Sequence, residues 1–407
     1  MKIQGIIAEY NPFHNGHKYH IDTGKKLSSA THTIVVMSGN FVQRGEPAIF
    51  DKFLRAKMAI KEGADLVIEL PTVFSLGSAE YFGHGAVSLL NSLAIVDVLS
   101  FGCEDDNMSP LQKIATILQD EPDEYKSILK SHLDKGLSFP KAREHALSEF
   151  AFAGKNVEEY FKPNNILGIE YIKSLKKLKS TIEINPVKRT GVSYYSSDIK
   201  NGIASATKIR KLLIEGNIEK VKEAVPEEIF SIVRDSINDN SYLALDDLRE
   251  IIYSNLLLSN IENLKMINDI SEGIENRLLS SIDPKLSIDH YLDKISSKRY
   301  TRTRLQRILI KTLLNLTDDY YKDSTGIHTH PLYARILGFN SKGREILAEL
   351  KKSSQIPIIT NINKFDRQLL EDQGKMLDMD IKASNLYSLM QKKPLYRDLT
   401  EKVYMEL

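Results

Sequence analysis

The first twenty residues place the strongest constraint on how this chain folds. An apolar run from Ile3 to Ala8 breaks at Asn11-Pro12, and a helical pattern follows from about Gly16 to Ser28. This order of strand, turn and helix is the opening unit of a parallel α/β sheet. The first backbone N–H groups of a helix have no intrahelical partner and carry the positive end of its dipole, so the turn suits a polyphosphate.

Two histidines follow this turn. His14 and His17 are three residues apart and share a face of the starting helix, and Gly16 between them permits close backbone approach. Two imidazoles beside an α-phosphate can donate hydrogen bonds to the charge that develops while that phosphate is attacked. An isolated H-x-G-H tetrapeptide also fits a fragment of a metal site, or chance. Its place directly after an N-terminal strand favours nucleotide chemistry.

Strand-like and helical segments alternate over the first two hundred residues. Apolar runs at 33–37, 65–70, 95–101 and 181–187 predict further strands, and helical spacing predicts helices at 50–62, 78–90, 109–152 and 163–175. In the helix at 50–62 the spacing places Arg55 on the outward face. This alternation is typical of a Rossmann-like, doubly wound parallel sheet. Because loops at the carboxyl ends of parallel strands line the ligand crevice, we expect residues 38–44 to border the same pocket as His14. An ordinary solvated loop is the alternative.

Three further residues lie where a nucleotide would bind such a sheet. Gly102 ends a strand and leaves room for an adenine ring or a ribose, Asn164 opens a helix, and Arg189 follows a strand with a guanidinium that suits a phosphate. Each also fits an ordinary role, as a turn glycine, a helix cap or an exposed basic residue. The segment from Ile203 to Arg210 places hydroxyls and a cation before a helix, which suits phosphates or a simple cap.

The second half of the chain has a different character. Beyond about Gly216 amphipathic helical segments dominate, at 245–258, 261–282, 300–316 and 343–351, and only 356–360 has a strand pattern. We therefore expect two domains, 1–215 and a mainly helical 216–407. One stretch predicts a helix face that attracts RNA phosphates, although a charge run is more often a solvated face. Its basic residues are Lys298, Arg299, Arg302, Arg304, Arg307 and Lys311.

The composition excludes several classes of protein. A net charge of +1 excludes a protein that coats nucleic acid, but leaves room for a local basic patch. Cys103 is the only cysteine, so neither an internal disulfide nor a cysteine-based zinc site can form. We see no signal peptide and no apolar run long enough to cross a membrane, and expect a cytoplasmic protein without a metal site or a tightly bound cofactor.

Longer motifs carry a resemblance to a known family. The H-x-G-H turn resembles the HIGH signature of the nucleotidyltransferase superfamily, and IASATKIR resembles the ISSTxIR motif that closes over the distal phosphates in that superfamily. Ala204 and Ala206 depart from the second pattern. The string EYNPFHNGH, followed by SGNFVQRGEPAIFDKFLRAKMAIKEGADLVIELP, is similar to the bacterial tRNA(Met) cytidine acetate ligases. The resemblance continues through KPNNILGIEY and SEGIENRL to SKRYTRTRLQR.

The resemblance implies a reaction and a set of site residues. Acetate would attack the α-phosphate of ATP, and His14 and His17 would act as the catalytic groups that stabilise this phosphate during the attack. The resulting acetyl-adenylate would then acetylate N4 of the wobble cytidine of elongator tRNA(Met). ATP, with Mg²⁺ travelling on it, is a substrate of this reaction. The implied ATP-binding residues are Ile7, Ala8, Glu9, Tyr10, Asn11, Pro12, Phe13, His14, Asn15, Gly16, His17, Lys18, Tyr19, His20, Gly102, Asn164, Arg189, Ser205, Thr207 and Arg210.

Two other functions remain compatible with the residues. A nucleotidyltransferase that joins ATP to a phosphorylated small metabolite would use the same first domain, but would leave the basic helical domain without a role. An RNA-binding protein with a decayed nucleotide site is the other alternative. It conflicts with the presence of both phosphate motifs with their chemically capable residues.

Overall fold

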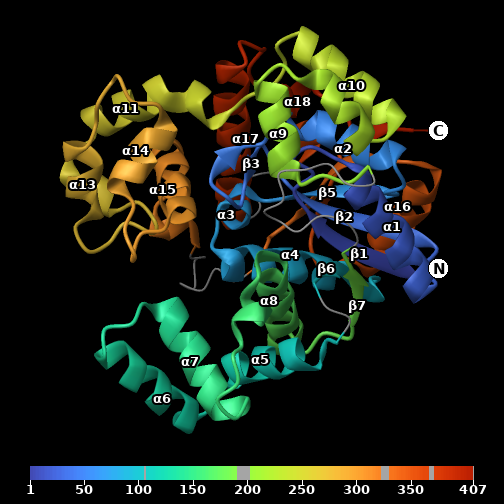
Figure 1. The fold of residues 1–407 in the computed structure, drawn as a ribbon. Coiled ribbons are helices and arrows are strands. Elements are labelled where there is room, and N and C mark those ends of the chain that lie inside the picture. Colours follow the sequence, from blue (N-terminus) through green and yellow to red (C-terminus); the bar gives the residue numbers. More distant parts are fainter. Residues whose placement is uncertain (105–106, 190–201, 322–329, 366–370, 407) are drawn as a thin grey trace.

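An eight-stranded sheet forms the centre of the molecule (Figure 1). The computed structural model describes residues 1–104, 107–189, 202–321, 330–365 and 371–406. The strand order is β10-β8-β5-β2-β1-β6-β7, β9 also pairs with β8, and every pairing is parallel except that of β5 with β8. The expected α/β class with a Rossmann-like parallel sheet is confirmed. The strands are β1 (Ile3–Ala8), β2 (His32–Ser38), β5 (Leu66–Leu70), β6 (Val98–Cys103), β7 (Glu183–Lys188), β8 (Ala334–Phe339), β9 (Ile358–Ile359) and β10 (Tyr404–Met405).

Helices cover both faces of this sheet, because the central strands are apolar on both sides. In β2, Ile34 and Val36 pack into one hydrophobic cluster with α4 and α8, whereas Val35 and Met37 pack into a second cluster with α1, α2, α9 and α10 (Glu227–Asn238). The first-half helices are α1 (Asn15–Ser28), α2 (Lys52–Lys61), α3 (Thr72–Ser75), α4 (Ala79–Ser92), α5 (Ser109–Asp120), α6 (Asp123–Asp134), α7 (Phe139–Ala151), α8 (Pro163–Lys177) and α9 (Ala206–Ile214).

The second half of the chain contributes more to the sheet than its pattern predicted. We expected one strand, at 356–360, but the structure forms β8 and β10 as well as the short β9. The six residues of β8 are almost continuously buried, and a short apolar run buried on both faces has no periodicity that separates strand from helix. The helices of this half are α10 (Glu227–Asn238), α11 (Arg249–Leu258), α12 (Ile261–Lys265), α13 (Ile274–Ser280), α14 (Ile288–Ile295), α15 (Arg302–Leu314), α16 (Ser341–Ser353), α17 (Glu371–Met390) and α18 (Arg397–Thr400).

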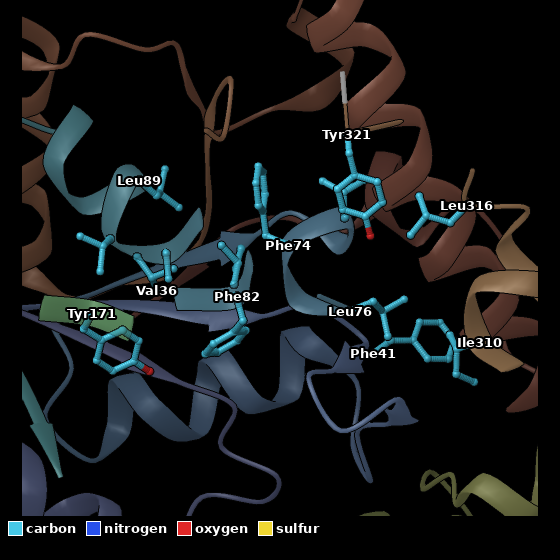
Figure 2. Close-up of a cluster of buried hydrophobic side chains, with 14 of the residues drawn as sticks. Val36, Phe41, Phe74, Leu76, Phe82, Leu89, Tyr171, Ile310, Leu316 and Tyr321 are labelled. Atoms are coloured by element: carbon cyan, nitrogen blue, oxygen red, sulfur yellow. The ribbon is translucent and has the colours of Figure 1, made fainter. Parts of the chain in front are cut away.

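Four of these helices, α11, α13, α14 and α15, form a lobe beside the sheet (Figure 1). The single helix predicted over 261–282 is divided into α12 and α13, because Asp269 and Glu272 between them adopt positive φ. The lobe shares its core with the sheet layer: Figure 2 shows Ile310 and Tyr321 in the same buried cluster as Phe41 and Phe74. No helix in the described part of the chain is long and apolar enough to span a membrane.

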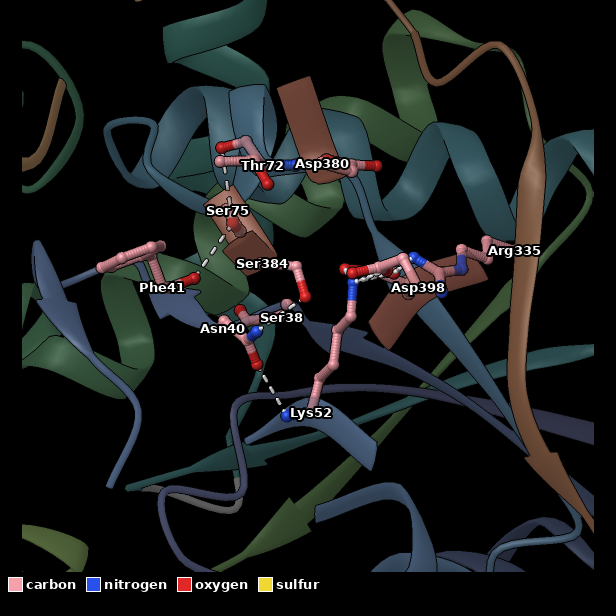
Figure 3. Close-up of polar contacts among 12 residues, drawn as sticks. Ser38, Asn40, Phe41, Lys52, Thr72, Ser75, Arg335, Asp380, Ser384 and Asp398 are labelled. Carbon is pink, nitrogen blue, oxygen red and sulfur yellow. Dashed lines mark hydrogen bonds and ion pairs between the residues drawn. The ribbon is translucent and has the colours of Figure 1, made fainter. Parts of the chain in front are cut away.

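A buried polar network joins the C-terminal segments to the first sheet strands (Figure 3). Lys52 of α2 pairs with Glu69 of β5 at 2.8 Å and with Asp398 of α18 at 2.6 Å. Arg335 of β8 pairs with the same two carboxylates, at 3.0 Å to Glu69. Asp380 of α17 accepts a hydrogen bond from the backbone N–H of Thr72 at 2.6 Å. Opposite charges therefore compensate one another inside the fold, where an unpaired charge would be costly.

A short hairpin connects the sheet to the lobe. It consists of β3 (Phe41–Val42) and β4 (Glu46–Pro47), paired antiparallel, and it follows β2 directly. Gly45 at its tip has φ of +79° and lies against the backbone of α15, where an added Cβ would be 2.1 Å from the nitrogen of Arg307. The hairpin therefore touches the lobe on one side and, through residues described next, the turn after β1 on the other.

Candidate active site

The two histidines of the opening turn cap helix α1. His14 is the N-cap residue, and its Nδ1 accepts a hydrogen bond from the backbone N–H of Gly16 at 3.1 Å. The Nδ1 of His17 accepts from the backbone N–H of His14 at 3.2 Å. The two imidazoles thus fill the reciprocal positions that Ser or Thr and Glu or Gln take in a capping box. The two rings stack with their centroids 3.6 Å apart.

These contacts also define the protonation state of the rings. An Nδ1 that accepts a backbone hydrogen bond cannot carry a proton, so the proton of each neutral ring resides on Nε2. Burial, with the charges of Arg189 and Arg210 adding to it, lowers the pKa of His14 to about 3. Burial and the neighbouring His14 lower the pKa of His17 well below its usual value. At neutral pH each ring is therefore a neutral donor with its N–H on Nε2.

A third histidine lies one turn further along α1. Burial and Arg189 lower the pKa of His20 to about 4, so it too is neutral. Its Nε2 is buried and has no hydrogen-bond partner among the described residues. A buried polar atom without a partner is uncommon in a folded protein and marks a place where a ligand or water would complete the bonding.

The predicted residues at the ends of β6 and β7 come together on one side of the turn. The Asn164 Nδ2 donates to the Glu104 carboxylate at 2.7 Å, and the Arg189 guanidinium donates to Asn164 Oδ1 at 3.5 Å. The backbone N–H of Arg189 donates to the carbonyl of Cys103 at 3.0 Å. A Cβ added to Gly102 would lie 3.5 Å from the Arg189 side chain. Glu104 was not predicted from the sequence, because an isolated carboxylate after a strand carries no motif.

The predicted distal-phosphate residues lie against the other side of the turn. Arg210 of α9 donates to the carbonyl of Asn11 at 2.9 Å and pairs with Glu46 of the hairpin at 2.7 Å. The Thr207 hydroxyl is 3.5 Å from donors of both Arg44 and Arg210. Ser205 is the N-cap of α9 and accepts from the N–H of Lys208 at 3.2 Å. The two segments that resemble phosphate motifs, almost two hundred residues apart in sequence, therefore lie side by side in the fold.

Glu9 joins the hairpin to this site. Its carboxylate accepts a hydrogen bond from the backbone N–H of Gln43 at 2.9 Å. Burial raises its pKa; the neighbouring Glu46 acts in the same direction, whereas Arg44 and Arg210 lower the value. This contact brings the chain after β2 against the residue that follows β1, and that residues 38–44 border one ligand pocket with His14 stays a prediction. The hairpin's pairing with Arg210 was not foreseen, because two-residue strands have no detectable period.

Arg55 of α2 is another residue that the sequence did not reveal. It is fully buried and donates to the carbonyls of Glu9 at 2.5 Å, Phe50 at 2.9 Å and Ser38 at 3.1 Å, as well as to that of Gly39. It therefore holds the chain after β1 and the chain after β2 in a fixed relation. Helical spacing had placed it on the outward face, but the strand ends supply the polar partners that allow an arginine to be buried.

Several residues of the predicted ATP-binding range hold the turn in place through packing, an ion pair and hydrogen bonds. Phe13 and Tyr10 are 0% and 2% exposed and pack into the second hydrophobic cluster. Lys18 pairs with Glu62 of the α2 end at 2.8 Å. Asn15 donates to the carbonyls of Gly202 at 2.8 Å and Glu223 at 3.0 Å, and so ties the chain before α9 to the start of α1.

The six basic residues at α15 do not share one exposed face. Arg307 and Lys311 are only 8% and 1% exposed, because α15 is enclosed by the hairpin and by its neighbouring helices. Lys311 pairs with Asp269 at 2.5 Å. Arg302 pairs with two aspartates, one of them Asp293 at 2.5 Å. At the N-terminal end of the stretch, Lys298 and Arg299 are exposed, and Arg302 and Arg304 are half-buried.

Comparison with known proteins identifies the family of the chain. The model of the HIGH nucleotidyl transferase family matches residues 1–402. The tRNA(Met) cytidine acetate ligase of Thermoanaerobacter sp. (strain X514) is 44% identical over 394 residues, which cover 96% of each chain. The protein of the same name from Acetivibrio thermocellus is 40% identical over 403 residues, covering 98% of this chain and 97% of the other.

The chain belongs to the HIGH nucleotidyltransferase family. Its fold also matches solved structures of Thermotoga maritima TmcAL, with 36% identity and coverage of 100% of this chain and 99% of the other in each case. The TM-score is 0.92 for the apo form and 0.90 for the form bound to alpha-thio ATP. The resemblance of the sequence motifs to the family of the tRNA(Met) cytidine acetate ligases is therefore confirmed. This nucleotidyltransferase is an enzyme of that family.

Proposed function

We propose that this nucleotidyltransferase activates acetate with ATP and acetylates the wobble cytidine of elongator tRNA(Met). An acetate oxygen attacks the α-phosphate of ATP, the bond to the bridging oxygen breaks, and pyrophosphate leaves with the electron pair. The N4 amine of the cytidine then attacks the acetyl carbon, AMP leaves, and the amine loses a proton. The products are N4-acetylcytidine, AMP and pyrophosphate. The observation that carries this proposal is the pair of neutral imidazoles that cap the start of α1.

The fixed tautomer of His14 and His17 suits the first step. Charge builds up on the oxygens of the α-phosphate as acetate attacks, and donors already in place stabilise that charge without reorganising. Because Nδ1 of each ring is held by the backbone, each Nε2–H is directed away from the helix end. No side chain is required as a nucleophile, since acetate supplies the attack and the protein supplies orientation.

The remaining residues form two groups, one on each side of the turn, and we assign a different part of the nucleotide to each group. Gly102, Asn164 and Arg189 form the side that we assign to adenosine and the adenylate. Thr207 and Arg210 form the side that we assign to the distal phosphates, with Ser205 holding the helix start through its cap. The arginine charges support binding of an ATP that carries Mg²⁺ as part of the substrate.

We assign ATP chemistry to residues 1–215 and tRNA binding to the helical lobe of 216–407. The lobe touches the hairpin that contacts Glu9 and Arg210, so an RNA bound to it would lie beside the nucleotide site. Among the basic residues predicted at α15, Lys298, Arg299, Arg302 and Arg304 remain candidates for RNA contact. The burial of Arg307 and Lys311 supports a structural role for both.

The test is acetate-dependent exchange between ATP and pyrophosphate, measured without tRNA. We expect exchange in the wild-type protein and its loss in His14→Ala, with tRNA affinity nearly unchanged. His14→Asn is the matched control for folding, because asparagine is also a good N-cap residue. Loss of exchange in both variants, with α1 intact, would identify the imidazole as the required group. Exchange with a phosphorylated metabolite in place of acetate would refute the proposal.

A further inference from the structure

We propose that a pocket in the helical lobe binds a backbone phosphate of the tRNA, an inference that rests on the proposed function. The pocket has a volume of about 200 Å³ and lies between the chain around Gly273 and the turn that precedes α15. Two of the longer strings in which the chain resembles its family, SEGIENRL and SKRYTRTRLQR, meet here. The lining residues are Glu272, Gly273, Ile274, Arg277, Ser297, Arg299 and Tyr300.

Arg277, one of the two arginines in the described lining, is held by neutral groups. Arg277 donates to the carbonyl oxygens of Lys294 at 3.0 Å and Ser296 at 3.2 Å. Lys294 itself donates to the carbonyl of Ser281 at 3.2 Å. A carbonyl oxygen orients a cation but leaves its net charge uncompensated, whereas a carboxylate would cancel it. The guanidinium of Arg277 is therefore both oriented and available to an anion.

Arg304 is held in a similar way. It donates to the carbonyl of Asp269 at 3.0 Å, and its guanidinium carbon lies 4.4 Å from the centre of the Tyr300 ring. Lys298, next to the pocket, is exposed. The contrast is Arg302, the first residue of α15, whose guanidinium is paired with both Asp289 and Asp293.

Glu272 is the single anionic residue in the described lining, and it pairs with Arg299 at 2.6 Å. Both side chains are largely exposed, with 52% of Glu272 and 73% of Arg299 accessible. An exposed ion pair of this kind contributes little to stability and is readily exchanged. A phosphate can therefore replace the Glu272 carboxylate at Arg299 while Arg277 stays in place.

The chemistry of the pocket favours a phosphate over a base. Tyr300 is 5% exposed and its hydroxyl contacts Ser271, so its ring is not open for stacking with a base. A planar guanidinium matches two oxygens of a phosphate, and contacts of this type position an RNA without reading its sequence. The pocket lies just before the start of α15, and further along that helix Arg307 donates to the carbonyl of Gln43 in the hairpin at 3.4 Å.

The experiment measures two properties of the variants Arg277→Ala and Lys298→Ala, namely tRNA(Met) binding and adenylate formation. Lys298→Ala is included because Arg277 also anchors a turn, whereas Lys298 is an exposed side chain beside it. Arg234→Ala removes an exposed arginine of α10, outside the lobe, and serves as the matched control. Circular dichroism and thermal unfolding confirm that each variant is folded.

We expect each pocket variant to weaken tRNA binding about three- to tenfold at physiological salt, and to make the slope of log K against log salt shallower by about 0.7–0.9. Acetate-dependent exchange without tRNA stays at the wild-type level, and Arg234→Ala behaves as wild type. Wild-type tRNA affinity in both variants, or weaker tRNA binding with an unchanged salt slope, would refute the proposal that the pocket binds a phosphate. Absence of acetate-dependent exchange in the wild-type protein would instead overturn the proposed function, because that assay contains no tRNA.

Discussion

Replacing Gly45 by alanine tests whether the hairpin seats the helical lobe against the nucleotide site. Gly45 has φ of +79°, and a Cβ there would lie 2.1 Å from the backbone nitrogen of Arg307 and 2.5 Å from the carbonyl carbon of Gln306. Backbone atoms inside a helix cannot move aside as a flexible side chain can. The hairpin must therefore withdraw from α15, and its contacts to Glu9 and Arg210 must change with it.

Two contributions set the size of the effect. A non-glycine residue in the left-handed region costs about 1–2 kcal/mol. Forcing extra atoms into a closely packed contact costs about 1–3 kcal/mol more. We therefore expect Gly45→Ala to lower the free energy of unfolding by about 2–5 kcal/mol. Gly136→Ala is the matched control, because Gly136 has φ of +84° and would place its Cβ where no atom lies within 4 Å. It should show only the backbone contribution.

Urea unfolding gives the free energy of unfolding, and calorimetry gives the dissociation constant for ATP. Gly45→Ala should lose more stability than Gly136→Ala and should bind ATP more weakly. Gly136→Ala, in the turn between α6 and α7, should bind ATP as the wild-type protein does. Equal losses of stability in the two variants, together with equal ATP affinity, would refute the role that we give to the hairpin.

Three further predictions follow from charges and protonation. Burial lowers the pKa of His14 below its unfolded value, so its contribution to stability is present above pH 6.5 and is lost as pH falls. Between pH 6.5 and 5 this loss is about 2 kcal/mol, and unfolding curves of His14→Asn should lack it. Asp398→Ala should lower the free energy of unfolding by about 3–5 kcal/mol, because Lys52 and Arg335 would lose a shared buried carboxylate. As a control, Lys126→Ala, which removes an exposed ion pair, should change the free energy of unfolding measured by thermal unfolding by less than about 0.5 kcal/mol. Arg210→Lys should weaken ATP binding in calorimetry about tenfold, because lysine lacks the fork that reaches Asn11 and Glu46 together.

The sequence predicted the opening unit and the residues around it well. Strand β1, the turn and helix α1 follow from a short apolar run, a proline and a polar helix start, all of which are local signals. The grouping of Gly102, Asn164 and Arg189 also followed, because the carboxyl ends of parallel strands meet at one edge of a sheet. In these cases the position of a residue at the end of a strand was enough to predict its neighbours, because the sheet topology brings the strand ends together.

Other features depend on contacts that local patterns do not encode. Arg55 was expected to face outward, yet it is buried among carbonyls of segments that its own helix does not contain. Arg307 was expected on a basic surface, yet α15 is enclosed, and its spacing resembles that of an exposed amphipathic helix. Strand β8 lay beyond prediction because its burial on both faces removes the alternation that identifies a half-exposed strand.

The hairpin explains why these missed contacts matter for the site. On one side, Arg307 donates to the carbonyl of Gln43 at 3.4 Å, and Gly45 lies against the same helix. On the other side, the N–H of Gln43 donates to Glu9, and Glu46 pairs with Arg210. A shift of α15 cannot leave the hairpin in place, and a shift of the hairpin alters both the opening turn and the residue assigned to the distal phosphates. The hairpin therefore contacts both the helical lobe and residues that we assign to ATP, although Gln43 and Arg307 are 264 residues apart in the chain.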